Sequence, residues 1–190
     1  MLRLGFAYLD SLLLTTLARP FMDELVAQVQ ESCSMAVLDG TDIVFIARVQ
    51  AKRLMSINLT VGSRLQATTT SMGRVLLAAL PDDELDAVLA AAYAQADVPV
   101  APTKDAISTP EALKKELRKV ARQGWALIDQ ELEVTLRTIA VPVHGPGGTV
   151  VAAMTLATHA AIVPRKKLVQ EFLPALLATA AAISQALRVT

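Results

Sequence analysis

The stretch SCSMAVLDGTDIVFIARV, residues 32–49, constrains the fold more than any other part of the sequence. It holds an apolar run, the pair Asp39-Gly40, and a second run rich in β-branched residues. An Asp-Gly pair between two such runs is typical of a β-hairpin, because its tight turn needs residues that tolerate positive φ. We therefore predict strands at 34–38 and 42–49 that pair with each other.

Further strands are predicted where apolar residues alternate or β-branched residues gather. The run RLMSINLTVGSRL, residues 53–65, alternates and should extend the sheet. Residues 125–129 read as another strand, and residues 137–143 and 150–157 as a second hairpin around the turn GPGG. The sequence thus predicts six strands.

The remaining apolar residues recur at helical spacing. The third and fourth of the six expected helices meet at Pro81 and Asp82, the fifth has Thr109 as N-cap and Gly124 at its end, and Pro174 should kink the last. The predicted helices cover residues 1–14, 17–32, 72–80, from 82, 110–123 and 164–187. Hairpins with helices grouped on the sheet faces indicate one α+β domain on a mostly antiparallel sheet.

The charge balance argues against a nucleic-acid surface. The chain has 18 basic and 18 acidic residues, hence zero formal net charge. A domain that binds DNA alone usually carries a basic excess on one face, because counterion release supplies most of the affinity. The five basic residues of the fifth helix interleave with Glu111 and Glu116 and are interpreted as a solvated face, with phosphate binding as the second reading. These five are Lys114, Lys115, Arg118, Lys119 and Arg122.

Neither a membrane span nor a disulfide is expected. The apolar runs at 134–143 and 150–157 are interrupted and shorter than the about 20 residues that cross a bilayer. The N-terminus lacks a signal-peptide cleavage site, and Cys33 is the only cysteine. We expect a soluble, cytoplasmic protein with Cys33 as a small buried hydrophobe.

Enzyme signatures are missing from the sequence. It has no G-x-S-x-G elbow, no phosphate-binding P-loop and no dinucleotide fingerprint. His144 and His159 do not stand at metal-ligand spacing with Cys33, so we expect no metal site and no cofactor. Asp129 and the two glutamates at 131 and 133 alternate, and two readings stay open: an acid and base pair, or ion-pair partners such as one for Arg137.

The stretch ATTTSMGR, residues 67–74, places four hydroxyl side chains before a glycine and an apolar helix. One hydroxyl is enough to cap a helix, and we expect Thr68 or Thr69 to do so. Two readings stay open for the others: they are simply exposed, or Thr70 and Ser71, with the bare backbone of Gly73, receive a carboxylate.

Five stretches in order resemble the effector-binding domain of IclR-type bacterial transcription regulators: DGTDIVFIARV, VGSRL, ATTTSMGRVLLAALPDDEL, GWALIDQELEVTLRTIAVPV and GTVVAAMTLA. The likeness is nearest to regulators of aromatic-acid catabolism through the β-ketoadipate (protocatechuate, 4-hydroxybenzoate) pathway. It implies a GAF-like sensor domain at residues 15–190 and a linker helix at 1–14. In the family this linker helix follows a winged helix-turn-helix that the present chain lacks.

The resemblance also implies an effector pocket between the sheet and the helix that follows VGSRL. Its residues should be Ile57, Leu65, Thr70, Ser71, Met72, Ile128, Leu136, Thr138, Thr155 and Ala157. An aromatic carboxylate would place its charge near Thr70, Ser71 and Met72. Its ring would lie against Ile57, Leu65, Leu136 and Trp125. Binding would shift a homodimer or tetramer between two DNA affinities, with DNA held only through the absent domain.

Three alternatives remain at this stage. The pocket could instead sense a short keto acid such as glyoxylate or pyruvate. An enzyme of unfamiliar type would use Asp129, Glu131 or His144. A constitutive interaction module would bind no small molecule at all. The effector itself, the direction of regulation and the promoter do not follow from the sequence.

Overall fold

The chain was analysed as a computed structural model that describes residues 2–51, 59–94, 103 and 106–189, with side chains from residue 13 onward. Its elements follow one another as α1 Leu2–Val29, β1 Ser32–Asp39, β2 Asp42–Val49, β3 Arg64–Gln66, the 3₁₀ turn η1 Ala67–Thr69, α2 Ser71–Leu77, α3 Asp82–Ala94, α4 Pro110–Gln123, β4 Ala126–Asp129, β5 Leu136–His144, β6 Val150–His159, α5 Arg165–Lys167, the π turn η2 Leu168–Phe172 and α6 Leu173–Val189.

One six-stranded antiparallel sheet, in the order β3-β2-β1-β6-β5-β4, forms the centre of the molecule. Both predicted hairpins are present, and Gly40 has the positive φ of 62° that its turn requires. The two hairpins join through β1 and β6, from Ser32 opposite Ala157 to Ala36 opposite Ala153. The predicted α+β class with six strands is confirmed.

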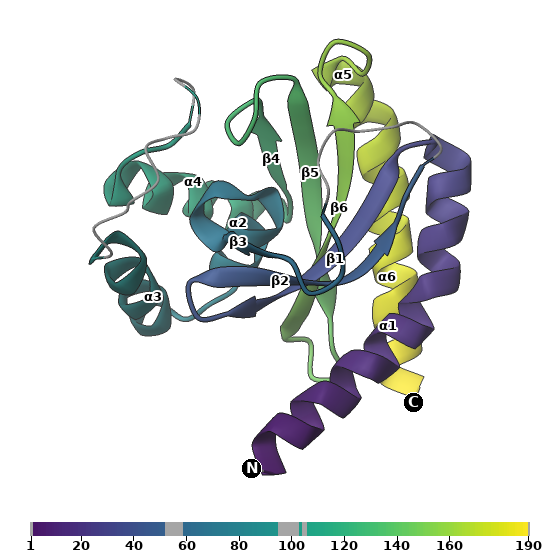
Figure 1. Ribbon diagram of the computed structural model, residues 1–190, viewed down its shortest axis with the longest axis horizontal. Helices are drawn as coiled ribbons and strands as arrows, with labels where there is room; N and C mark the ends of the chain where they lie inside the picture. Colours follow the sequence, from purple (N-terminus) through teal and green to yellow (C-terminus); the bar gives the residue numbers. More distant parts are fainter. Residues whose placement is uncertain (1, 52–58, 95–102, 104–105, 190) are drawn as a thin grey trace.

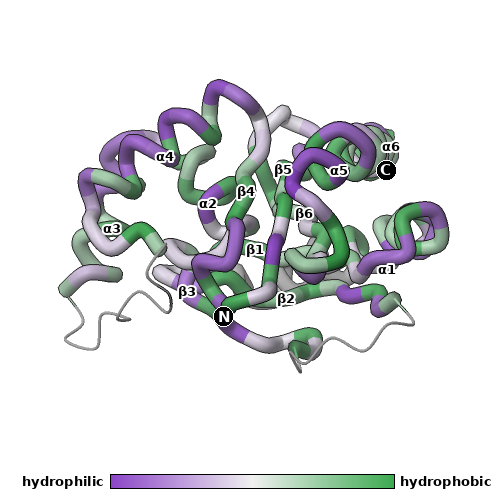
Figure 2. Tube along the Cα trace, turned by 90° about the horizontal axis from the view of Figure 1, so that it is seen from above, coloured by the Kyte–Doolittle hydropathy of each residue, from purple (hydrophilic) through white to green (hydrophobic). Residues whose placement is uncertain are grey.

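Helices cover both faces of the sheet (Figures 1 and 2). On one face α1 and α6 pack side by side, while α2, α3 and α4 lie over the other. Alternation along the strands feeds both cores: in β6, Met154 belongs to the α1–α6 core and Ala153 to the α2–α4 core. Each face of the sheet therefore packs against its own apolar core.

Helix α1 differs from the prediction, which divided it into helices at 1–14 and 17–32. The structure has one continuous helix, Leu2–Val29, with Pro20 inside it. The predicted helices were separated at Thr15 and Thr16, but a buried stripe of Leu14, Ala18 and Met22 continues past these two residues. Packing of a continuous apolar face outweighs the modest helix propensity of threonine.

Two other predicted elements are shorter in the structure. The third strand was expected over 53–65, but β3 spans only Arg64–Gln66, and residues 52–58 lie outside the described part of the chain. Gly62 has a φ of 90°, so the backbone turns there just before β3. Helix α2 covers Ser71–Leu77 rather than 72–80, because the chain turns ahead of Pro81.

The expected irregularity at Pro174 takes the form of a wider turn. The π turn η2 ends just before this proline, and the amide of Leu173 donates to the carbonyl of Leu168. Residues 165–189 are long and apolar enough, by length and composition alone, to cross a bilayer, a feature the sequence analysis did not single out. One face of this stretch, including Leu176 and Ile183, is buried against the sheet.

Candidate functional site

A cavity of about 280 Å³ lies on the α2 face of the sheet. The turn η1–α2 and the loop after β4 close over strands from both hairpins at this point. Its lining is mostly apolar with a few polar groups, which is the usual composition of a small-molecule site. The cavity is lined by Ser34, Phe45, Arg48, Leu59, Leu65, Thr69, Thr70, Ser71, Met72, Ile128, Leu132, Glu133, Leu136, Thr138, Thr155 and Ala157.

Hydroxyl groups fix the shape of the η1–α2 turn. Thr70, not Thr68 or Thr69, is the N-cap of α2: its Oγ1 accepts from the amide of Gly73 at 3.1 Å. Thr69 donates to the carbonyl of Gln66 at 3.1 Å. The prediction of the cap was wrong because the preceding 3₁₀ turn uses Thr68 and Thr69 within its own backbone turn, which delays the start of α2. A hydroxyl that accepts a bond still has its hydrogen, so Thr70 can donate to a ligand.

Ser71 differs from Thr70, because its hydroxyl donates within the protein rather than accepts. Its Oγ lies 3.3 Å from Oγ1 of Thr155, and that threonine donates its hydrogen to the carbonyl of Ile139 at 2.9 Å. A threonine hydroxyl has one hydrogen, so Ser71 must be the donor in the bond between them. The oxygen of Ser71 is left with acceptor capacity toward the cavity, where it suits a hydroxyl of a ligand.

Arg48 is the cation of the cavity and was missed by the sequence analysis. Its Nη1 donates to Oγ of Ser34 at 3.4 Å, while its buried Nε has no hydrogen-bond partner. Among the residues that the structure describes, no carboxylate forms an ion pair with it. Burial lowers the pKa of Arg48, since desolvation disfavours the charged form. A partly buried guanidinium without an anion is a ready site for a ligand carboxylate.

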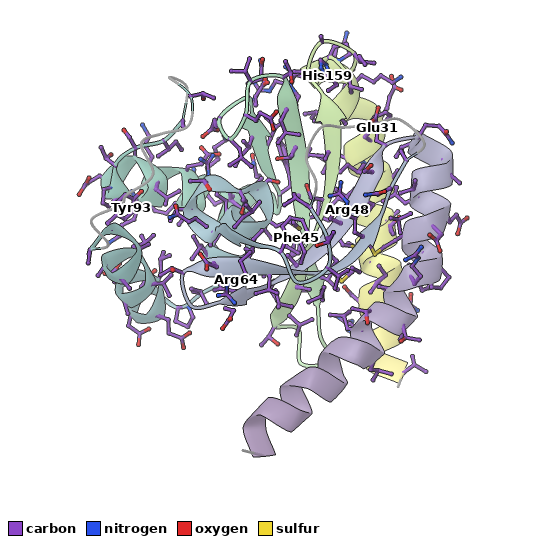
Figure 3. All side chains as sticks on the ribbon, viewed as in Figure 1. Glu31, Phe45, Arg48, Arg64, Tyr93 and His159 are labelled. Carbon is purple, nitrogen blue, oxygen red and sulfur yellow. The ribbon has the colours of Figure 1, made fainter. Side chains whose placement is uncertain are left out.

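A β-bulge sets the facing of Arg48, which Figure 3 labels together with Phe45. The register of β1 and β2 shifts so that Met35 pairs with Ala47 and Ala36 pairs with Phe45, which leaves Ile46 as an extra residue. Before the bulge Phe45 faces the α2–α4 core, and after it Ala47 faces the α1–α6 core. Arg48 therefore shares the face of Phe45, whereas strict alternation would have placed it on the opposite face.

The structure brings nine of the ten predicted pocket residues together around this cavity, and the tenth, Ile57, lies outside the described residues. Trp125 does not join them, because it packs against the α1–α6 core instead. Of the seven lining residues that the prediction lacked, Arg48 carried a signal: it is a charged residue within the otherwise apolar run 43–49. Ser34 and Phe45 lie on the same face as Ala36 and Ile43, respectively, by regular alternation along β1 and β2, so the bulge does not set their facing.

The structure does not bring the three alternating carboxylates together. Strand β4 ends at Asp129, and Gln130, with a φ of 62°, turns the chain, so the three do not share one face. Asp129 pairs with Nη2 of Arg137 at 2.8 Å, as the ion-pair reading expected. Glu131 pairs instead with Arg74. His144, at the far end of β5, lines a different groove near Gly124 and Ser184.

A helix-covered antiparallel sheet that encloses an apolar cavity with one partly buried cation has the features of a small-molecule binding domain. The family model described as bacterial transcriptional regulator IclR C-terminal matches residues 6–185. The chain therefore belongs to this family of bacterial transcriptional regulators.

Known relatives agree with this assignment. The chain is 45% identical over 178 residues to the Pca regulon regulatory protein of Pseudomonas putida, covering 93% of the chain and 60% of the relative. A crystal structure of a proposed transcriptional regulator from Rhodococcus sp. RHA1 matches with a TM-score of 0.88 at 43% identity, covering 99% of this chain and 75% of that one. The inducer-binding domain of the Acinetobacter PobR transcription factor was solved as a double mutant with 3-hydroxybenzoic acid. It matches with a TM-score of 0.79 at 26% identity, covering 90% of this chain and 97% of that one.

Proposed function

We propose that this domain senses a small aromatic or dicarboxylic acid of aromatic catabolism through the cavity beside α2. The observation that carries the proposal is Arg48, a cation with a buried, unpartnered Nε in a cavity whose other walls are largely apolar. A carboxylate supplies the missing anion, and the apolar walls suit the rest of such a molecule.

The names of two relatives support this ligand class. The Pseudomonas putida relative is a regulator of the Pca regulon, and the PobR domain was solved with a hydroxybenzoic acid. The chain spans 60% of the length of the first, so the activity of a whole regulator is part of the proposal. In it, residues 1–14 link the sensor, residues 15–190, to a DNA-binding winged helix-turn-helix in a cytoplasmic dimer or tetramer.

In the proposed complex, each polar group of the cavity forms a hydrogen bond to the ligand that it does not form within the protein. The ligand carboxylate accepts from Nε of Arg48 and from the hydroxyl of Thr70, and the acceptor oxygen of Ser71 receives a ligand hydroxyl. The ring packs between apolar side chains that come from four different strands and from α2. These side chains are Phe45, Leu65, Met72, Ile128 and Leu136.

Such a ligand can act as a signal only through a difference in affinity between two arrangements of the regulator. The polar groups that would touch it belong to β2 and the η1–α2 turn, and Leu132 and Glu133 of the loop after β4 line the same cavity. Closure of these three segments around the acid is the change that the rest of the protein would detect. The helix α1, on the other side of the sheet, would carry the change toward the DNA-binding domain.

A thermal-shift screen tests the proposal. Protocatechuate, 4-hydroxybenzoate, β-ketoadipate, glyoxylate and pyruvate are added separately to the chain. We expect at least one of the first three to raise the melting temperature in a concentration-dependent manner. Stabilisation by the two keto acids alone would replace this ligand class with the short keto acids, and no stabilisation by any of the five would contradict sensing of such acids.

Two variants localise the ligand. Arg48→Gln should abolish the shift because it removes the counter-ion, and Ser71→Leu should abolish it by filling the cavity. Arg64→Gln is the matched control, since Arg64 is an exposed arginine that pairs with Asp39 and Asp42 outside the cavity. A ligand shift that survives Arg48→Gln would place the acid elsewhere.

A further inference from the structure

Helix α3 is a strongly acidic and thinly covered element. It carries four acids and no basic residue, and all four acids are exposed. Of its 13 residues only Leu89 is fully buried, while Leu85 and Val88 are only partly covered. The acids are Asp82, Asp83, Glu84 and Asp86. A helix that buries so little of its surface leaves an apolar and acidic face in solvent.

Helix α4, which lies beside α3, is the basic counterpart. It buries Leu113, Leu117 and Val120 against the core and carries five basic residues against two acids. Lys114 pairs with Asp86 of α3 at 2.6 Å, and Lys119 pairs with Glu116 of its own helix. The other three cations, Lys115, Arg118 and Arg122, are exposed and have no ion-pair partner among the described residues.

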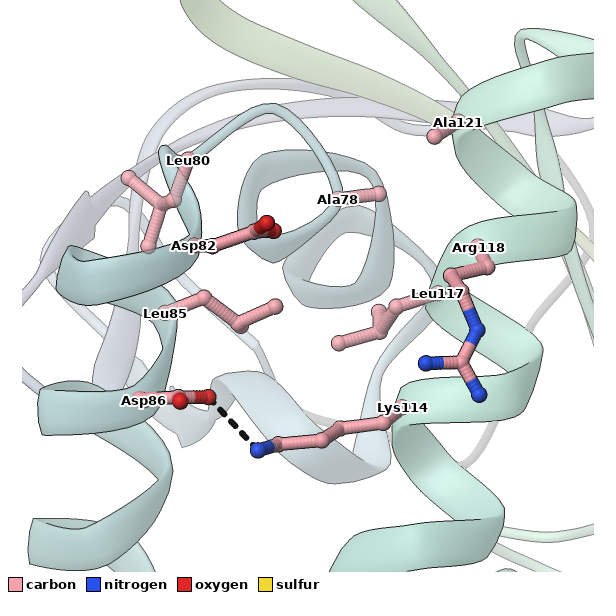
Figure 4. Close-up of a pocket in the computed structure, with 9 residues that line it drawn as sticks. All are labelled: Ala78, Leu80, Asp82, Leu85, Asp86, Lys114, Leu117, Arg118 and Ala121. Carbon is pink, nitrogen blue, oxygen red and sulfur yellow. Dashed lines mark ion pairs between the residues drawn. The ribbon is translucent and has the colours of Figure 1, made fainter.

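Between the two helices runs a groove of about 340 Å³ (Figure 4). Its apolar floor includes Leu85 and Leu117, Asp82 lies on its α3 side, and Arg118 lies on its α4 side. Figures 1 and 2 show both helices at the end of the molecule away from α1 and α6. The cavity proposed for the ligand is lined by neither helix, so this surface is separate from that site.

We infer that the α3–α4 surface is a contact between two copies of this chain, related by a two-fold axis along the groove. In such an isologous contact α3 of one protomer faces α4 of its partner, and α4 faces α3. The acidic helix then meets the basic helix twice. A molecule with an acidic helix beside a basic helix matches a copy of itself in charge only when α3 of each protomer faces α4 of the other. This charge complementarity is the reason for assigning the occupant as a second copy.

Other occupants fit the surface less well. A nucleic acid would be attracted by α4 but repelled by the acids of α3, since both line the same groove. A small anion would find Arg118 but also Asp82 in the groove. A second copy uses both charges and covers the apolar floor, which neither of the other occupants does.

The size of the surface predicts a weak contact. Each helix is about 20 Å long, so the pair presents about 400 Å² to a partner, roughly half of the about 800 Å² per partner of a standard stable interface. The association should therefore be modest and sensitive to salt, and it should add to contacts elsewhere in a larger assembly.

Reciprocal charge reversal tests the contact in the absence of ligand. The α3-reversed variant is Asp82→Lys with Asp83→Lys, and the α4-reversed variant is Lys115→Glu with Arg118→Glu. None of these four residues forms a described ion pair within the chain. Sedimentation velocity at about 50 mM and about 500 mM salt measures self-association, which we expect salt to weaken. Each variant alone should associate about tenfold or more weakly at low salt, because like charges then meet across the axis.

A mixture of the two variants is the decisive sample. The positive α3 of one meets the negative α4 of the other, and the two unchanged helices still match, so mixing should restore association to about the wild-type level. Arg165→Glu with Lys166→Glu, on exposed residues of α5, makes the same charge change elsewhere and should have no effect. A wild-type chain with no salt-sensitive association, or variants that fail to recover on mixing, would overturn the contact.

Discussion

Gly73 is the residue on which the shape of the η1–α2 turn most depends. A Cβ at this position would overlap the backbone of Ala67, because α2 crosses the 3₁₀ turn there at close range. Backbone atoms cannot move aside as a flexible side chain can. Only a residue without a Cβ allows this crossing, and the cap from Thr70 to Gly73 holds it in place.

Gly73→Ala should therefore destabilise the domain by about 2 kcal/mol or more, in the range of overpacked core sites. It should also reduce ligand-induced stabilisation, because Thr70 and Ser71 would be displaced. Gly147→Ala is the matched control, since a Cβ at Gly147 would meet nothing within 4 Å. Urea unfolding of both variants measures the difference, and equal stabilities would show that the crossing is not tight.

Cys33 provides a second test at this scale. The side chain is fully buried in β1, and burial raises the pKa of its thiol to about 12. At pH 8 the reactive thiolate is thus almost absent, so a thiol reagent such as DTNB should not label the folded chain. The chain unfolded in urea should react with one equivalent. Fast labelling of the folded chain would mean that β1 opens readily.

Some residues of the site could be identified from the sequence and others could not, and the difference has physical reasons. Ser71 and Met72, which the resemblance assigned to a pocket at the start of a helix, line the cavity in the structure. Arg48 was missed because its facing depends on one extra residue in the strand, and hydrophobic alternation reports a bulge only weakly. Trp125 was misplaced because it alternates with Ala126, which belongs to the α2–α4 core, and therefore packs with Leu127 against the α1–α6 core.

At the scale of elements, the ion pair of Arg74 and Glu131 joins α2 to the loop after β4. Arg74 is 2% exposed, and its two terminal nitrogens meet the carboxylate of Glu131 at 3.1 and 2.6 Å. The same glutamate accepts from the amide of Ile107 and, through its carbonyl, from Thr103. One side chain thus ties together three segments, two of which border the cavity.

Glu131→Gln should destabilise the domain by about 3 kcal/mol, because it leaves the buried guanidinium of Arg74 without its anion. Glu116→Gln, which breaks an ion pair on the exposed face of α4, should cost no more than about 0.5 kcal/mol. Guanidinium unfolding compares the two. Hydrogen exchange should also accelerate in the loop 130–135 of the first variant. Similar losses in both variants would refute the special role of this pair.

The elements show why the fold class was predictable while several boundaries were not. Turn residues such as Asp39-Gly40 act locally, so both hairpins could be identified from the sequence. The continuity of α1 depends on a stripe of residues that pack against the sheet and α6, and the length of β3 depends on its pairing with β2 over three residues. Such features are settled by tertiary contacts that local sequence patterns do not contain.

At the scale of the whole molecule, the sheet is the only layer that both cores share. The cavity belongs to the α2–α4 side, while α1, the proposed route to a DNA-binding domain, belongs to the other. The central pairing of β1 and β6 carries residues of both cores on opposite faces of the same strands. A change around the ligand must pass through the sheet to reach α1, and β2 offers a direct route, because it carries Arg48 of the cavity and also Ala47 and Val49 of the α1–α6 core.

The shared sheet predicts that the two layers unfold together. Trp125 is the only tryptophan and packs in the α1–α6 layer, so its fluorescence reports on the side opposite the cavity, while circular dichroism reports on all helices. Both signals should give the same urea midpoint. At a concentration of 100 Kd, a ligand bound to the folded state alone should stabilise it by about 2.7 kcal/mol and move both midpoints equally. If the ligand moved the dichroism midpoint but left the Trp125 midpoint in place, the layers would be uncoupled, and binding beside α2 could not be signalled through α1.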